Sequence, residues 1–152
     1  MQLSPAGLDF IKQAEGFRSR TYLDAAGVPT IGYGHRLLHS ESFPNGVTGQ
    51  EATEILLKDV AEAEQAVERL VKVMLTQGQF DALVDFCFNL GQGRLAASTL
   101  LKALNVGRYA AAAEQLLLWD LAAGKPNSAL KARREGEVNL WNGVLQPSQT
   151  AA

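Results

Sequence analysis

Glu15, Asp24 and Thr30 are the side chains near the start of the sequence whose types and spacing suit proton transfer and water activation. We expect Glu15 at the C-terminal end of a helix, where the negative end of the helix dipole disfavours the ionised carboxylate and raises its pKa. A raised pKa suits a general acid that works near neutral pH. Asp24 and Thr30 flank a predicted tight turn, so their side chains could hold and orient one water molecule.

An acid on one side of a sugar and a positioned water on the other are the groups that inverting glycoside hydrolysis requires, with the carboxyl groups about 6.5–9.5 Å apart. Ordinary structural roles are open to the same residues. An aspartate before a turn commonly forms an Asx-turn, a threonine suits a strand, and a glutamate at a helix end can be a plain surface residue. Spacing alone leaves both interpretations open.

A short helix and a β-hairpin are the elements that must position these side chains. Ser4 and Pro5 are typical of a helix start, and Gly16 is typical of a helix end. The segment 20–34 then predicts two strands joined by a turn at 25–27. This arrangement places the three candidate residues in one small N-terminal unit.

Hydrophobic periodicity predicts helices for the rest of the chain. Thr48 and Glu51 have the spacing of a capping box, and they open a long helix predicted over 49–74. Thr76 and Gln79 repeat that spacing and open a core helix. Further expectations are a helix break at 91–93, helices over 98–104, 107–121 and 128–140, a loop at 123–127, and a frayed tail at 146–152.

Together these elements predict a single α+β domain over residues 1–152, mostly α. A small lobe with a short β-hairpin is expected over about 1–48, a connecting helix over about 49–74, and a helical lobe over about 75–145. Two lobes joined by one helix imply a cleft between them, and the candidate residues belong to the smaller lobe.

Composition limits the possible classes of protein. The 152 residues are 47% hydrophobic and 20% charged, which is enough for one core without disulfides or a structural metal. The net charge of −2 argues against nucleic-acid binding. Cys87 is the only cysteine, and its apolar surroundings favour a buried, inert thiol over a nucleophile. The sequence shows neither an export signal nor a run of 18 apolar residues.

Residues 15–35 follow the pattern E-G-F-R-x-x-x-Y-x-D-x-x-G-V-x-T-I-G-Y-G-H, which resembles the catalytic segment of the phage T4-type lysozymes, the endolysins of glycoside hydrolase family 24. The segments LTQGQFDALVDFCFNLGQG, STLLKALN and ARREGEVNLW are similar to later helices of that family. The resemblance implies a lysozyme-like fold and a muramidase that cleaves the β-1,4 bond between N-acetylmuramic acid and N-acetylglucosamine in peptidoglycan. It implies Glu15 as general acid, with Asp24 and Thr30 holding the nucleophilic water.

The same resemblance suggests substrate-binding residues in the helical lobe. Phe88 and Asn89 match a family segment that lines the cleft, although a core position for Phe88 and a helix C-cap for Asn89 are equally open. Arg133 and Arg134 could pair with Glu15 or bind carboxylates of the cell wall. Alternatively, one arginine pairs with Glu135 or Glu137 on its own helix.

The family needs no metal or other cofactor, whereas His35 and His39, four residues apart, suggest a metal-dependent wall hydrolase as a weaker hypothesis. A lytic transglycosylase and a non-enzymatic wall-binding module are also open, although Asp24 and Thr30 argue against the former. We expect peptidoglycan glycan strands as the partner and a monomeric protein. It should accumulate in the cytoplasm of an infected bacterium until a separate pore-forming protein, a holin, releases it to the wall.

Overall fold

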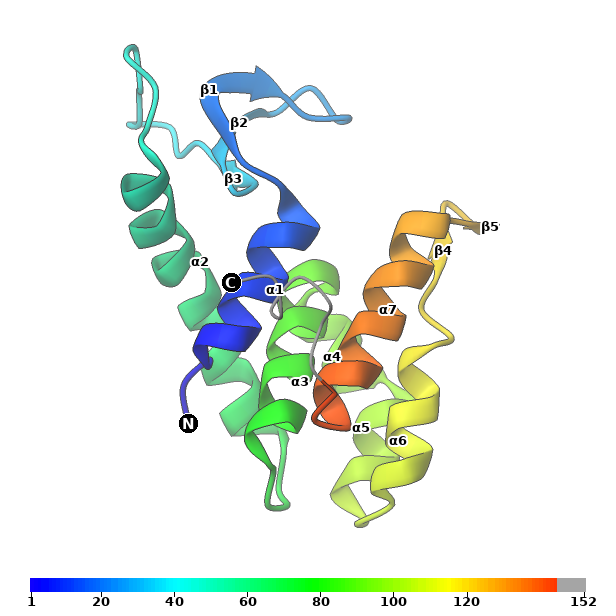
Figure 1. The fold of residues 1–152 in the computed structure, drawn as a ribbon. Coiled ribbons are helices and arrows are strands. Elements are labelled where there is room, and N and C mark those ends of the chain that lie inside the picture. Colours follow the sequence, from blue (N-terminus) through cyan, green and yellow to red (C-terminus); the bar gives the residue numbers. More distant parts are fainter. Residues whose placement is uncertain (145–152) are drawn as a thin grey trace. The chain divides into compact units, whose positions relative to one another are not determined.

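The computed structural model describes residues 1–144 and has the expected mostly helical architecture with small antiparallel sheets (Figure 1). Its elements in order are α1 (Pro5–Glu15), β1 (Arg18–Leu23), β2 (Pro29–Gly32), β3 (His35–Arg36), α2 (Gly49–Leu70), α3 (Gln77–Leu90), α4 (Gln92–Ala97), α5 (Thr99–Asn105), α6 (Tyr109–Leu116), β4 (Leu121–Ala122), β5 (Lys125–Pro126) and α7 (Ser128–Trp141). The predicted fold class is confirmed.

The chain forms two compact units, whose boundaries fall inside α1 and α2. The sheet unit comprises residues 9–62, and the helical unit comprises residues 1–8 together with the described residues 63–144. The first residues join the helical unit because the backbone N–H of Ser4 donates to Oδ1 of Asp81 on α3 at 3.0 Å, and the Ser4 hydroxyl also contacts that carboxylate. The division into lobes at 1–48 and 75–145 stays a prediction.

The sheet unit is built on the antiparallel order β1-β2-β3. Thr30 at the centre of β2 lies opposite Tyr22 on β1 and Arg36 on β3. A small apolar core supports this sheet, and its buried members are Ile31, Val47 and Ala52. Packing of Ile31 against Val47 and Ala52 therefore helps to hold β2 in place.

The helical unit is held together by packing between its helices. α3 packs against α7, and α5 packs against α6 (Figure 1). The predicted capping box at the start of α3 is confirmed, because Thr76 and Gln79 each bond the other's backbone N–H. Cys87 on α3 is buried, and desolvation raises the pKa of its thiol to about 11. The prediction of a buried thiol is confirmed, and such a thiol carries its proton at neutral pH.

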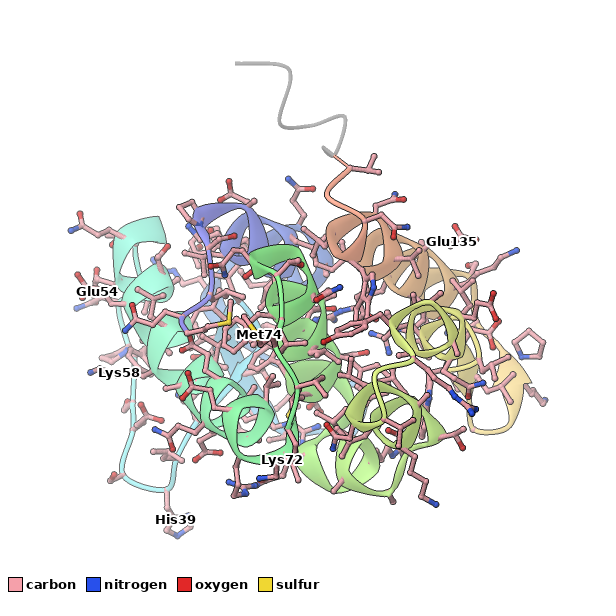
Figure 2. The ribbon with its side chains drawn as sticks, turned by 90° about the horizontal axis from the view of Figure 1, so that it is seen from below. His39, Glu54, Lys58, Lys72, Met74 and Glu135 are labelled. Atoms are coloured by element: carbon pink, nitrogen blue, oxygen red, sulfur yellow. The ribbon has the colours of Figure 1, made fainter. Side chains whose placement is uncertain are left out.

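The long helix opens at its predicted capping box of Thr48 and Glu51 but ends earlier than expected. α2 ends at Leu70 rather than at residue 74. Asn105, at the end of α5, donates from Nδ2 to the carbonyl of Leu70 at 3.0 Å and accepts from the backbone N–H of Lys72 at 2.8 Å. This side chain replaces the next helical hydrogen bonds, so the helix stops and Met74 is 89% exposed in the loop beyond it (Figure 2).

Short elements account for the other differences from the prediction. The helix predicted over 107–121 ends at Leu116, where i→i−3 hydrogen bonds from residues 117–119 tighten the chain and lead it out of the helix. The strands β4 and β5 then form a hairpin that the sequence pattern did not indicate. Earlier in the chain, the helix α4 begins at Gln92, where the sequence predicted only a break at 91–93. Two-residue strands are too short for a periodic signal.

Within the described residues, no helix is both long and apolar enough to span a bilayer. The tail predicted at 146–152 lies outside the described residues.

Candidate active site

Glu15 is the last residue of α1, as its position before a glycine predicted. Gly16 follows with a φ of +73°, a left-handed conformation that ends helices, and its N–H donates to the carbonyl of Lys12 at 2.9 Å. The Glu15 side chain reaches the turn between β2 and β3 in the same unit. Its Oε2 lies against the backbone of Gly34, in the turn between β2 and β3.

Asp24 follows β1 and forms the Asx-turn expected of its structural role. Its Oδ1 accepts from the N–H groups of Ala26 at 2.8 Å and Val28 at 2.9 Å, while Nη2 of Arg36 lies 3.2 Å from Oδ2. The hydrogen bond from Val28, assisted by the one from Ala26 and by the Arg36 charge, lowers the pKa of Asp24. The carboxylate is therefore ionised at neutral pH and held in one orientation.

Thr30 is only 3% exposed, and its hydroxyl donates to the carbonyl oxygen of Val28 at 2.8 Å. The same carbonyl accepts from the backbone N–H of Asp24 at 3.0 Å. Val28 therefore joins the two residues that were predicted to hold a water molecule. The structure brings Glu15, Asp24 and Thr30 into one unit, the sheet unit.

His35 lies next to Gly34 and bridges two carboxylates rather than approaching His39. Its Nδ1 is 2.8 Å from Oδ2 of Asp59 on α2, and its Nε2 is 2.9 Å from Oε1 of Glu41. Burial of the ring opposes its charge, but the hydrogen bonds to Glu41 and Asp59 outweigh burial and raise the pKa of His35. Burial also raises the pKa of Asp59. In contrast, hydrogen bonds from the backbone N–H of Leu38 and from the His35 ring lower the pKa of Glu41.

The metal hypothesis relied on His35 and His39. His39 is exposed and projects outward from the loop after β3 (Figure 2). Across residues 1–144, the structure brings no group of three His, Cys, Asp or Glu side chains together in an arrangement that could hold a metal ion. The geometry around His35 thus supports a structural role, in which its hydrogen bonds to Asp59 and Glu41 anchor the turn that carries Gly34.

The His35 bridge predicts a pH-dependent stability. We expect His35→Asn to lower the free energy of unfolding by about 2 kcal/mol at pH 5.5, because two charge-assisted hydrogen bonds are lost. A raised folded-state pKa means that the stabilisation is fully present below the ordinary histidine pKa of about 6.5 and disappears as the pH rises through the folded-state value. Urea unfolding at pH 5.5 and pH 8.5 measures the difference.

His39→Asn is the matched control for that experiment, because His39 is exposed and the same substitution should change stability little at either pH. A loss of stability in His35→Asn that is equal at the two pH values would contradict the charged bridge.

Phe88 and Asn89 lie in the last turn of α3, where both are half-buried. Gly91, and not Asn89, caps the helix, so the suggested role of Asn89 as the C-cap is wrong. Arg134 on α7 is fully buried, and its Nη2 donates to Oδ1 of Asn89 at 2.8 Å and to Oε1 of Glu137 at 2.6 Å. The alternative in which one arginine pairs with Glu137 on its own helix is thereby confirmed for Arg134.

Arg133 contacts Asp85 on α3, with Nε 3.0 Å from Oδ2 and Nη2 2.7 Å from Oδ1. Arg134 Nη2 lies 3.8 Å from the same carboxylate. Asp85, Arg134 and Glu137, which are buried, and Asn89 and Arg133, which are partly exposed, therefore form one polar group, here called the α3–α7 cluster. It joins two helices that pack against each other inside the helical unit.

The α3–α7 cluster is only partly satisfied by its own hydrogen bonds. Nε and Nη1 of Arg134 and Oε2 of Glu137 are buried without a hydrogen-bond partner. Burial, reinforced by the nearby Asp85 carboxylate, raises the pKa of Glu137 well above its usual range, and burial lowers that of Arg134. In a buried group of this kind, removal of one charged partner strongly destabilises the fold, because the other partner is left buried without compensation.

Sequence reasoning missed Asp85 and Arg36 as parts of these sites. Asp85 stands inside an otherwise apolar helical run, and a buried carboxylate in such a run requires a cationic partner. That rule applied to residues 80–88 would have singled it out. Arg36 carried no comparable signal, because its contact with Asp24 depends on how β3 pairs with β2.

Comparison with known proteins gives consistent matches along nearly the whole chain. The family model described as phage lysozyme matches residues 12–137. The endolysin of Salmonella phage P22 is 40% identical over 137 residues, which cover 88% of this chain and 94% of that protein. The endolysin of Bacillus phage B103 is 44% identical over 147 residues, or 93% of this chain, but this chain spans only 54% of its length.

Solved structures agree with these sequence matches. An endolysin from Escherichia coli O157:H7 phage FAHEc1 superposes with a TM-score of 0.88 at 37% identity, and the match covers 97% of each chain. The likeness thus includes both the sheet unit and the helical unit.

Proposed function

This chain belongs to the phage lysozyme family, and on that premise we propose that it is an endolysin of the T4-type branch, glycoside hydrolase family 24, acting as a muramidase. It hydrolyses the β-1,4 bond between N-acetylmuramic acid and N-acetylglucosamine in peptidoglycan, with inversion. The observation that carries the proposal is the family match over residues 12–137, which contains Glu15, Asp24 and Thr30.

In this mechanism Glu15 donates its proton to the glycosidic oxygen, so the sugar leaves as a neutral alcohol when the C1–O bond breaks. A water molecule held by Asp24 and Thr30 attacks C1 from the opposite face. Asp24 accepts the proton that the water loses, and exchange with solvent later restores the proton of Glu15. Inversion follows because the new C–O bond forms opposite the one that breaks.

The hydrogen bonds around Val28 support the assignment of the water site. Because the Thr30 hydroxyl donates to the Val28 carbonyl, its oxygen is left to accept a hydrogen bond. Asp24 is ionised and is likewise an acceptor. A water that donates one hydrogen to each of them presents its lone pair to the sugar, which is the orientation that nucleophilic attack requires.

Phe88, Asn89, Arg133 and Arg134 remain our proposed substrate-binding residues, with different expected roles. Phe88 and Asn89 are half-buried and retain surface that a sugar can contact. Arg134 is fully buried, so we propose that it acts by orienting the Asn89 amide through their 2.8 Å hydrogen bond. The Arg133 guanidinium group is held in place by its hydrogen bonds to the Asp85 carboxylate.

Mass spectrometry of the products from purified sacculi tests the reaction class. A muramidase releases muropeptides that end in reducing N-acetylmuramic acid, one water heavier than the anhydro sugars that a lytic transglycosylase makes. Anhydro products would overturn the assigned roles of Asp24 and Thr30. Binding to sacculi without any new reducing ends would identify a wall-binding module instead.

Release by a holin and a monomeric state belong to the same proposal. Expression in a bacterial cell without a holin should leave the cells intact until the inner membrane is permeabilised, and co-expression with a holin should lyse them. Lysis without either treatment would contradict holin dependence. Light scattering of the purified protein should give a mass near 16.4 kDa.

A further inference from the structure

Gly34 differs from neighbouring glycines in what surrounds it. Its φ of +76° lies in the left-handed region that favours glycine, as do those of Gly16 and Gly27. A Cβ at Gly16 or Gly27 would meet nothing within 4 Å, whereas a Cβ at Gly34 would lie 2.7 Å from Oε2 of Glu15 and 3.5 Å from its Cδ. The Glu15 carboxylate therefore occupies the space that a side chain at position 34 would need.

Contacts of Tyr33 hold the turn against the end of α1. The ring of Tyr33 packs on that of Phe17 with centroids 5.4 Å apart, and Nζ of Lys12 lies 5.6 Å from the Tyr33 centroid. Lys12 and Phe17 flank Glu15 in the sequence, so these contacts fasten the turn to the segment that carries the carboxylate.

His35 fastens the turn on the other side of Gly34. Its ring nitrogens lie 2.8 Å from the Asp59 carboxylate and 2.9 Å from that of Glu41. A methyl group added at position 34 therefore meets a turn that is held on both sides. The flexible Glu15 side chain must move instead.

We infer that Gly34 is a positioning residue, whose missing side chain leaves the space in which the Glu15 carboxylate is held for proton transfer. The inference rests on the proposed role of Glu15 as general acid. Gly34 acts through the placement of that carboxylate and not on the substrate itself. A displacement of a reacting group by about 1 Å can reduce the rate by about 10²-fold.

Gly34→Ala tests the inference, with Gly107→Ala as its matched control. Gly107 has a φ of +80°, a Cβ added there would meet nothing within 4 Å, and the residue lies in the helical unit. Both variants should lose similar thermal stability, because each places alanine in a left-handed conformation. On soluble peptidoglycan strands, we expect Gly34→Ala to lower kcat about 10²-fold with KM within about threefold, and Gly107→Ala to change neither.

Two further variants separate positioning from a general loss of structure. Gly34→Asn keeps the obstructing Cβ but tolerates the left-handed backbone better, so it should fold and show the same loss of kcat. In a Glu15→Gln background, Gly34→Ala should not lower the residual rate further, because its effect passes through the missing carboxyl group.

Three results would overturn the inference: activity of Gly34→Ala and Gly34→Asn as high as that of Gly107→Ala, a rise in KM with kcat unchanged, or a full additional loss in the Glu15→Gln background. Failure of the proposed function is distinguishable, because the unchanged protein would then release no reducing N-acetylmuramic acid from sacculi.

Discussion

Glu15→Gln is expected to lower the rate of lysis of outer-membrane-permeabilised cells by about 10²–10⁴-fold, the usual contribution of a general acid. The amide has nearly the same size and shape as the carboxyl group but has no proton to give to the glycosidic oxygen. Loss of turbidity measures lysis, and circular dichroism and thermal unfolding should show an intact fold. Retained lysis in a folded Glu15→Gln protein would contradict the assignment of Glu15 as the general acid.

Glu54→Gln is the matched control for this experiment. Glu54 lies exposed on α2 in the same unit as Glu15 (Figure 2), so the same chemical change there should leave lysis unaltered. Equal losses in the two variants would indicate that overall charge, and not a proton donor, controls the reaction.

The second large effect is expected in the α3–α7 cluster. Arg134→Met should lower the free energy of unfolding at pH 7 by about 3–5 kcal/mol, because it removes one partner from a buried charge group. Glu137 and Asn89 then lose their hydrogen bonds to Nη2, and Asp85 loses a nearby cation. Urea unfolding followed by circular dichroism measures the change.

The double variant Arg134→Met with Glu137→Leu shows whether these residues act as a unit. Glu137→Leu removes the buried carboxyl group that Arg134→Met leaves without its partner, so we expect the double variant to recover a large part of the stability lost in Arg134→Met. Arg94→Met on α4 is the control, since Arg94 is exposed and its replacement should change stability by about 0.5 kcal/mol or less. If the double variant lost as much stability as the single variants Arg134→Met and Glu137→Leu together, the residues of the cluster would not be coupled.

Features set by neighbours three or four residues apart were predictable from the sequence. The capping boxes at the starts of α2 and α3 both form. The α1 helix ends before Gly16, and the hairpin that carries Asp24 and Thr30 lies where its turn residues indicated. In each case the interacting groups lie within a few positions of one another, so local spacing contains the information.

The end of α2 shows where such reasoning stops. The apolar pattern continues to residue 74, whereas the helix ends at Leu70, where Asn105, distant in the sequence, takes over the hydrogen bonds of the backbone. Likewise, the spacing of His35 and His39 suggested a pair, whereas the fold gives His35 the carboxylates of Asp59 and Glu41. Competing partners from other elements decided both outcomes.

The sequence by itself determined the residue types available for chemistry, the mostly helical class, and the elements that carry Glu15, Asp24 and Thr30. Only the tertiary structure decided that the Glu15 carboxylate fills the space beside Gly34 and that Asp85 joins two arginines from α7. The physical reason is that helix caps and turns are local hydrogen bonds, whereas these contacts exist only after distant segments have packed together.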